Sequence, residues 1–174
     1  TLTFNASTFQ WSGSNLNASN GGQVNQTGDY TLNNGRTATI ESGADLMATG
    51  YFDVGNISNG TLIVDGVGST FTSAGGYTEV GLGGSTGVAT FRNGATANIN
   101  STYAIARSNT TASTSGTVNV QSGAGLTTNN IRIGSLDGNQ GSGTMNVDGL
   151  GSTVLQNGVA SLGIGKVNTA NNVA

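Results

Sequence analysis

The 174-residue chain contains no cysteine, no histidine and no proline, and only 5 basic and 8 acidic residues. Without cysteine and histidine it forms no disulfides, no thiolate or imidazole metal sites and no Cys or His nucleophile systems. Proline cannot donate to a strand ladder, so its absence suits a chain that is mostly ladder. The net charge of −3, with no run of like charge, argues against binding of nucleic acid or anionic lipid.

No apolar run approaches the roughly 18 residues that span a bilayer, so membrane insertion is not expected. The first residues, TLTFNAST, include neither an initiating Met nor a signal-like segment, which predicts a processed product or a fragment. The 30 glycines and abundant Ser, Thr and Asn are compatible with disorder. However, the missing proline, the low charge and the regularly spaced apolar residues favour an ordered chain.

One short pattern of alternating apolar residues followed by a glycine turn occurs five times. The five copies are TATIESGA (37–44), TLIVDGVGS (61–69), VATFRNGA (88–95), TVNVQSGA (117–124) and TMNVDGLGS (144–152). Their second inward apolar residues are Ile40, Val64, Phe91, Val120 and Val147, which are 24, 27, 29 and 27 residues apart. Self-similarity at such a period is typical of stacked repeat architectures.

Each period holds three apolar segments with the two-residue alternation of half-buried strands. After the first, a second begins at Leu46, Phe71, Ala97, Leu126 and Val154, and a third ends at Val54, Val80, Ile105, Ile133 and Leu162. Strands this short bury their inner faces only if equivalent strands stack on one another. The sequence therefore predicts an all-β fold, a right-handed parallel β-helix (β-solenoid) of about six coils of roughly 24–29 residues, with three short strands each.

The pattern divides the chain into an incomplete or capping N-terminal coil (1–35), the repeat coils (36–165) and the start of a further coil (166–174). No amphipathic helix is predicted to close either end, and an open coil presents unpaired strand edges over an apolar core. We expect flanking repeats of a longer chain, or copies of the same chain, to cover these ends head to tail. The candidate self-assembly contacts are Leu2, Phe4, Trp11, Val167 and Val173.

The motif V-D-G-x-G-S followed by V-G-x-x-G recurs in the chain. It stands at 64–69 and 80–83, then at 147–152, with a variant at 162–165. It resembles the β-strand repeat of autotransporter (type V secretion) passengers and of PEP-CTERM-associated bacterial surface proteins. An aromatic residue often follows the G-S-T step in that repeat; Phe71 fits and Val154 does not. The resemblance implies a secreted β-helix on the bacterial cell surface and implies no catalysis.

Two stacked rows of polar residues could carry chemistry. One follows the first strand (Glu41, Asp65, Arg92, Gln121, Asp148), and the other lies in the third (Asp53, Glu79, Ala104, Arg132, Ser161). Two acids one coil apart could form an acid/base pair or hold a cation. The favoured interpretation is a solvated ladder that nearby arginines partly neutralise, because aromatics and bases are not interleaved with the acids. No enzyme and no catalytic residue are predicted.

Three further patterns are weaker. Asp137 and Asn139 lie in a DGNQG segment that could hold Ca²⁺, but it lacks the closing Glu of a calcium loop, so an inter-strand turn is favoured. Thr-x-Thr pairs such as Thr70 and Thr72 could form an ice-binding face, but the rows are not sustained from coil to coil. The many Asn-x-Ser/Thr triplets leave glycosylation open. No cofactor and no metal are predicted.

The leading expectation is a structural, extracellular β-helix that forms or extends a bacterial surface or matrix fibre. The alternative is an adhesin module whose loops at 108–116 and 134–143 bind glycans or host surfaces. A polysaccharide-degrading enzyme acting through Asp53 and Glu79 is the least favoured. The expected partners are copies of the same chain or flanking repeats, with glycans as a further candidate.

Overall fold

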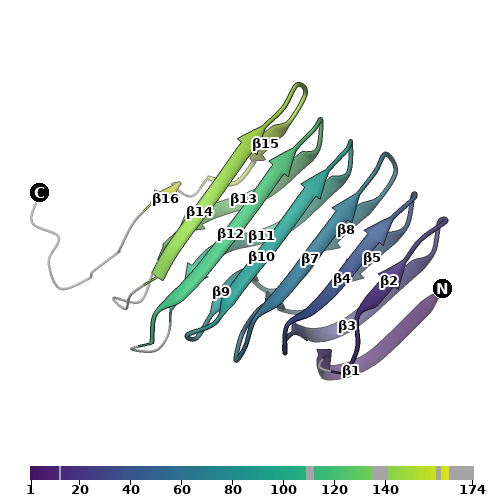
Figure 1. The fold of residues 1–174 in the computed structure, drawn as a ribbon, viewed down its shortest axis with the longest axis horizontal. Coiled ribbons are helices and arrows are strands. Elements are labelled where there is room, and N and C mark those ends of the chain that lie inside the picture. The colour runs from purple at the N-terminus through teal and green to yellow at the C-terminus, as the bar shows by residue number, and fades with distance from the viewer. Residues whose placement is uncertain (12, 109–111, 135–140, 160–161, 165–174) are drawn as a thin grey trace, which may run out of the picture.

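In the computed structural model the chain forms a row of parallel strands that advances from the N-terminus toward the C-terminus (Figure 1). The structure describes residues 1–11, 13–108, 112–134, 141–159 and 162–164. Within these ranges the regular elements are all strands. They are β1 (Leu2–Trp11), β2 (Leu16–Ala18), β3 (Gln23–Leu32), β4 (Arg36–Glu41), β5 (Asp45–Ala48), β6 (Phe52–Val54), β7 (Gly60–Asp65), β8 (Thr70–Ser73), β9 (Thr78–Leu82), β10 (Thr86–Arg92), β11 (Thr96–Arg107), β12 (Thr114–Gln121), β13 (Gly125–Ile133), β14 (Gly141–Asp148), β15 (Thr153–Gln156) and β16 (Gly163–Ile164).

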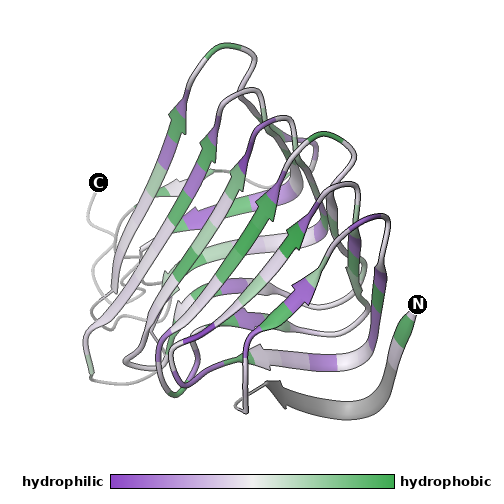
Figure 2. Ribbon diagram, turned by 45° about the vertical axis from the view of Figure 1, so that its right-hand side comes forward, coloured by the Kyte–Doolittle hydropathy of each residue, from purple (hydrophilic) through white to green (hydrophobic). Residues whose placement is uncertain are grey.

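The strands form two sheets, each made of parallel strands, that face each other across a common interior. The first sheet has the order β14-β12-β10-β7-β4-β2, so that it contains the first strand of each period. Its register places Ile40, Val64, Phe91, Val120 and Val147 directly on one another. The predicted parallel β-solenoid and its inner ladder are thereby confirmed, and apolar and polar residues alternate along these strands (Figure 2).

The predicted second and third strands belong to one ten-stranded sheet. They are separate as β5 and β6, and as β8 and β9, but β3, β11 and β13 run through the corner without a break. In β11 the extra corner residue is absorbed by a register shift between Ile99 and Thr102 against β13. The corners that interrupt the strand contain glycine (Gly50, Gly75 and Gly76), whereas the uninterrupted one in β11 has Asn100 and Ser101. Glycine alone does not decide the difference, because β3 runs unbroken through its corner at Gly28.

Aromatic side chains form a continuous stack inside the solenoid. Tyr30 lies on Phe52 with ring centroids 4.9 Å apart, and Phe52 lies 4.8 Å from Phe71. Phe71 in turn lies 6.4 Å from Phe91. All four side chains are fully buried. Such pairs contribute about 0.5–1.5 kcal/mol each beyond the burial of their area, so the stack ties consecutive coils together.

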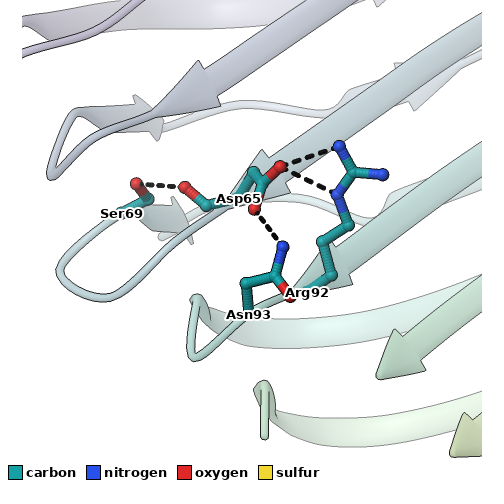
Figure 3. A network of polar contacts seen from close by, with 4 residues as sticks. All are labelled: Asp65, Ser69, Arg92 and Asn93. Carbon is teal, nitrogen blue, oxygen red and sulfur yellow. Dashed lines mark hydrogen bonds and ion pairs between the residues drawn. The ribbon is translucent and has the colours of Figure 1, made fainter. Parts of the chain in front are cut away.

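The D-G-x-G-S motif builds a turn that also bonds to the preceding coil. Gly66 and Gly68 take φ values of 93° and 82°, which side-chain-bearing residues rarely adopt. The following Ser69 is fully buried, and its hydroxyl donates to the carbonyl of Asp65 at 2.7 Å (Figure 3). The same hydroxyl accepts the backbone N–H of Gly43, one coil earlier, at 3.1 Å. The serine therefore closes its own turn and bonds it to its neighbour.

Replacing Ser69 with alanine should destabilise the protein by about 1–3 kcal/mol, because a partly buried carbonyl and a partly buried N–H lose their partner. Ser152 makes the same two bonds, to Asp148 and Gly123, but lies in the exposed last coil. Ser152→Ala is the matched control and should cost less, since water reaches the groups it leaves. Urea unfolding followed by circular dichroism measures both, and equal losses would contradict the assigned role of burial.

Candidate functional site

The last described strands expose residues that are core residues everywhere else. Val147 of β14 stacks on Val120 of β12 and is 50% exposed, whereas Val120 is fully buried. Met145 and Val154 are likewise only partly buried, although they stack on buried residues. In the part of the chain that the structure describes, β14 and β15 each pair on one side only. An apolar surface and an open strand edge therefore meet at this end, beside β14 in Figure 1.

Other large apolar side chains are exposed at the same end. Of the eleven such side chains exposed among the described residues, six follow residue 146. They are Val147, Leu150, Leu155, Val159, Leu162 and Ile164. Leu150 holds the same turn position as the exposed Val67. Leu155 stacks on the outward Thr127. Val147, by contrast, occupies a position that is buried in the other coils. Exposed apolar residues beside an open strand edge are typical of surfaces that bind a partner. We call β14, β15 and these six residues the terminal surface.

The opposite end is better covered. Leu16 and Ala18 of β2 and Val24 of β3 are buried, although β2 is the edge strand of its sheet. β1 pairs with β3 in parallel and extends the second sheet by one strand. The two ends of the solenoid are thus unlike.

The predicted self-assembly contacts fall partly on β1. Leu2 is 46% exposed there, and the backbones of Phe4 and Trp11 pair with those of Gln26 and Leu32. The structure thus brings the three N-terminal candidates together on one edge strand. Val167 and Val173 lie outside the described residues. The terminal surface itself was not among the predicted contacts, because Val147 follows the core pattern in sequence and is exposed by its place in the last described coil.

The row of polar residues after the first strand stacks as predicted, from Glu41 through Asp65 and Arg92 to Gln121 and Asp148. Arg92 donates to Asp65 Oδ2 through Nε at 2.8 Å and lies 2.7 Å from it through Nη2 (Figure 3). Asn93 donates to Oδ1 at 2.7 Å. Burial alone would raise the pKa of Asp65, but these hydrogen bonds and the arginine charge lower it. The group is an exposed ion pair that stabilises the stack.

The acids of the third strand are not solvated, and that prediction is wrong. Asp53 and Glu79 are register partners on β6 and β9, and they are 7% and 2% exposed. The neutralising arginine is Arg107, which contacts Glu79 at 2.5 Å and lies over the ring of Tyr77. Arg132 stacks on Ala104 in the same row, as predicted. The next register partner of Arg132 is Gly163 and not the predicted Ser161, which lies outside the described residues.

Burial is the largest cause of the perturbed pKa of Asp53, which is raised to about 7. The charge of Glu79 raises it further, whereas the hydrogen bond that Asn56 donates at 2.7 Å lowers it. Oδ1 of Asp53 is buried and accepts no hydrogen bond from the described residues. It gains a partner when the carboxyl is protonated and donates to Glu79. A general acid must reach the substrate atom that it protonates, so the depth of this pair gives the acid/base interpretation no support.

No protein-family model, curated protein or solved structure matches the chain. Support for a function therefore comes from the geometry of the two ends and the side faces of the solenoid.

The structure gives little support to the remaining predicted sites. Asp137 and Asn139, the candidate calcium ligands, lie outside the described residues, as do parts of the predicted adhesive loops. Over the described ranges no group of three or more acidic residues is placed to hold a metal ion. None of the described residues forms a helix that could cross a bilayer. The row through Thr70 continues to Thr96, but Asn98 follows Thr72, so the threonine pairs are not sustained.

A pair of neighbouring tyrosines on the side of the solenoid was missed in the sequence. Tyr51 and Tyr77 lie at the same corner of consecutive coils, with ring centroids 5.9 Å apart. Each follows a glycine, and they are 26 residues apart, close to the period of the repeat. The repeated Gly-Tyr pair at the coil spacing is the signal that would have revealed them.

Proposed function

We propose that the protein is a structural, extracellular component of a bacterial surface or matrix fibre, built as a right-handed β-solenoid of about six coils. The observation that carries the proposal is the terminal surface, where the core of the solenoid continues into the open. A further coil of the same repeat fits this surface, because it supplies both the missing ladder and the missing apolar layer. The resemblance of the D-G-x-G-S repeat to those of autotransporter passengers is the reason for placing the protein outside the cell.

The further coil is supplied either by flanking repeats or by a second copy of the chain. We favour a second copy, whose β1 edge would stack on the terminal surface. Because the two ends of the solenoid are unlike, such a contact joins different surfaces and does not close. Repetition then extends a rod, in which hydrogen bonds and the stacked core resist bending and proteolysis.

Replacing Val147 with aspartate should abolish this association, because the contact would bury a carboxylate without a partner. The wild-type sedimentation coefficient should rise with protein concentration, and that of Val147→Asp should stay at the monomer value. Val147 is half exposed and terminal, so the variant should keep its circular dichroism spectrum.

Val67→Asp is the matched control, because Val67 is 83% exposed in a turn away from the terminal surface. It should associate as the wild type does. A wild type that stays monomeric at all concentrations would contradict polymerisation and favour flanking repeats of a longer chain. Association of Val147→Asp like the wild type would exclude the terminal surface as the contact.

The second candidate function, an adhesive module, is favoured by a different observation, a hollow beside Tyr51 and Tyr77 on the side of the solenoid.

A further inference from the structure

A hollow of about 220 Å³ lies at the corner between the second and third sides of the solenoid. It spans consecutive coils, from the corner after β5 to the middle of β13. Its lining consists of aromatic, hydroxyl and amide side chains with no charged residue among them. The lining residues are Tyr51, Gly76, Tyr77, Ser101, Thr102, Asn129 and Asn130.

The tyrosines form a fixed aromatic wall at one end of the hollow. Tyr51 is 42% exposed and its ring lies against Gly76, where an added Cβ would come within 2.9 Å of the ring. Tyr77 is held from another side by Arg107, whose guanidinium carbon is 5.2 Å from the ring centroid. Glu79 neutralises that arginine. The wall is therefore rigid, exposed and without net charge.

The opposite end of the hollow is formed by the two asparagines Asn129 and Asn130. Asn129 is exposed, and its amide nitrogen donates to the carbonyl of Asn100 at 2.8 Å. Asn130 donates to Thr102 Oγ1 at 3.3 Å, while its own Oδ1 is buried and has no partner among the described residues. The exposed amide of Asn129 is therefore the group at this end that a hydroxyl in the hollow can reach.

We propose that this hollow binds one sugar ring of a neutral oligosaccharide. A tyrosine ring packs against the C–H face of a pyranose, and amide and hydroxyl groups bond to its hydroxyls. A lining without charge does not select an anionic polymer. The volume lies below that of sites for drug-sized ligands, so one ring is held while the chain extends over the open surface. Asp53 and Glu79 lie buried outside the lining, so the site binds without cleaving.

The site does not depend on self-assembly, but assembly would multiply it. Copies stacked end to end would repeat the hollow along the side of the rod. A polysaccharide that reached several copies would then bind with much higher avidity than a single site provides. An isolated chain should therefore bind weakly, with a Kd of about 1 mM or somewhat below.

Calorimetric titration with cellohexaose, xylohexaose, mannohexaose and maltohexaose tests the proposal, with polygalacturonate as the anionic probe. At least one neutral oligosaccharide should bind, and Tyr51→Ala should weaken its binding at least about fivefold. Asn129→Ala should weaken it as well, and because its side chain is exposed this variant keeps the test open if Tyr51→Ala misfolds. Ile57→Ala is the control, since Ile57 is 75% exposed and lies outside the lining.

The proposal is overturned if no neutral oligosaccharide binds at about 10 mM, ten times the expected Kd. It is equally overturned if polygalacturonate alone binds, or if Tyr51→Ala and Asn129→Ala bind as the wild type does. Sedimentation of the same samples reports assembly independently. Loss of sugar binding with intact association, or the reverse, therefore shows which of the two proposals has failed.

Discussion

Gly116→Ala should destabilise the solenoid by at least about 4 kcal/mol, or prevent it from folding. A Cβ at this position would lie 2.1 Å from the carbonyl oxygen of Val80 and 2.5 Å from the backbone nitrogen of Ala106. Both are backbone atoms held in sheet ladders, so they cannot move aside as a flexible side chain could. The same close approach recurs at the stacked positions near the start of three other first strands, at Gly60, Gly87 and Gly143.

Gly125→Ala is the matched control for this substitution. Gly125 also lies in a strand, β13, and the nearest atom to an added Cβ is Thr153 Oγ1 at 3.6 Å. Alanine there should be neutral or stabilising by up to about 1 kcal/mol. Urea unfolding followed by circular dichroism compares the two. The same transition midpoint for Gly116→Ala and Gly125→Ala would show that the neighbouring coil yields, contrary to the packing described above.

The need for glycine at these four stacked positions could not be predicted from the sequence, although much of the surrounding coil could. The inner ladder through Ile40 and Val64 was predictable, because burial enforces alternation within a strand and stacking enforces the period between strands. The turn glycines were predictable from their position after each strand. The need for glycine at 116 arises instead from a carbonyl 36 residues earlier, at Val80, and local sequence carries no sign of that contact.

In the candidate sites, too, the features that follow from the repeat were predictable and those that depend on distant contacts were not. A repeat pattern implies that an uncovered coil exposes the apolar residues of its ladder, and Val147 is such a residue in the last described coil. Val167, the predicted contact, lies outside the described residues. The burial of Asp53 could not be predicted, because an outward position on a strand is normally solvated. Asn56, three residues after Asp53, hydrogen-bonds to that acid, and Arg107 at the end of β11 donates to Glu79 from 28 residues away, a contact that local sequence does not reveal.

The buried acid pair makes stability depend on pH in an unusual direction. The pKa of Asp53 rises from an ordinary value of 3.8 to about 7 in the folded protein. Between these values the folded state holds a proton that the unfolded state has lost, so stability falls as pH rises, by about 1.4 kcal/mol per unit. The whole loss is at most about 4 kcal/mol and is complete somewhat above pH 7.

Asp53→Asn should remove this slope and make the protein more stable than the wild type at pH 8. The amide can accept from Asn56 and donate to Glu79 as the protonated acid does, but it carries no charge at any pH. Asp65→Asn is the control: the pKa of Asp65 is lowered from 3.8, so its exposed pair with Arg92 is fully present at both pH 5 and pH 8, and the variant should lose about 0–1 kcal/mol, the same at both. Urea unfolding at pH 5 and pH 8 separates the three proteins. A wild type equally stable at both values, or a slope that persists in Asp53→Asn, would mean that Asp53 is ionised throughout and that its burial is compensated by other groups.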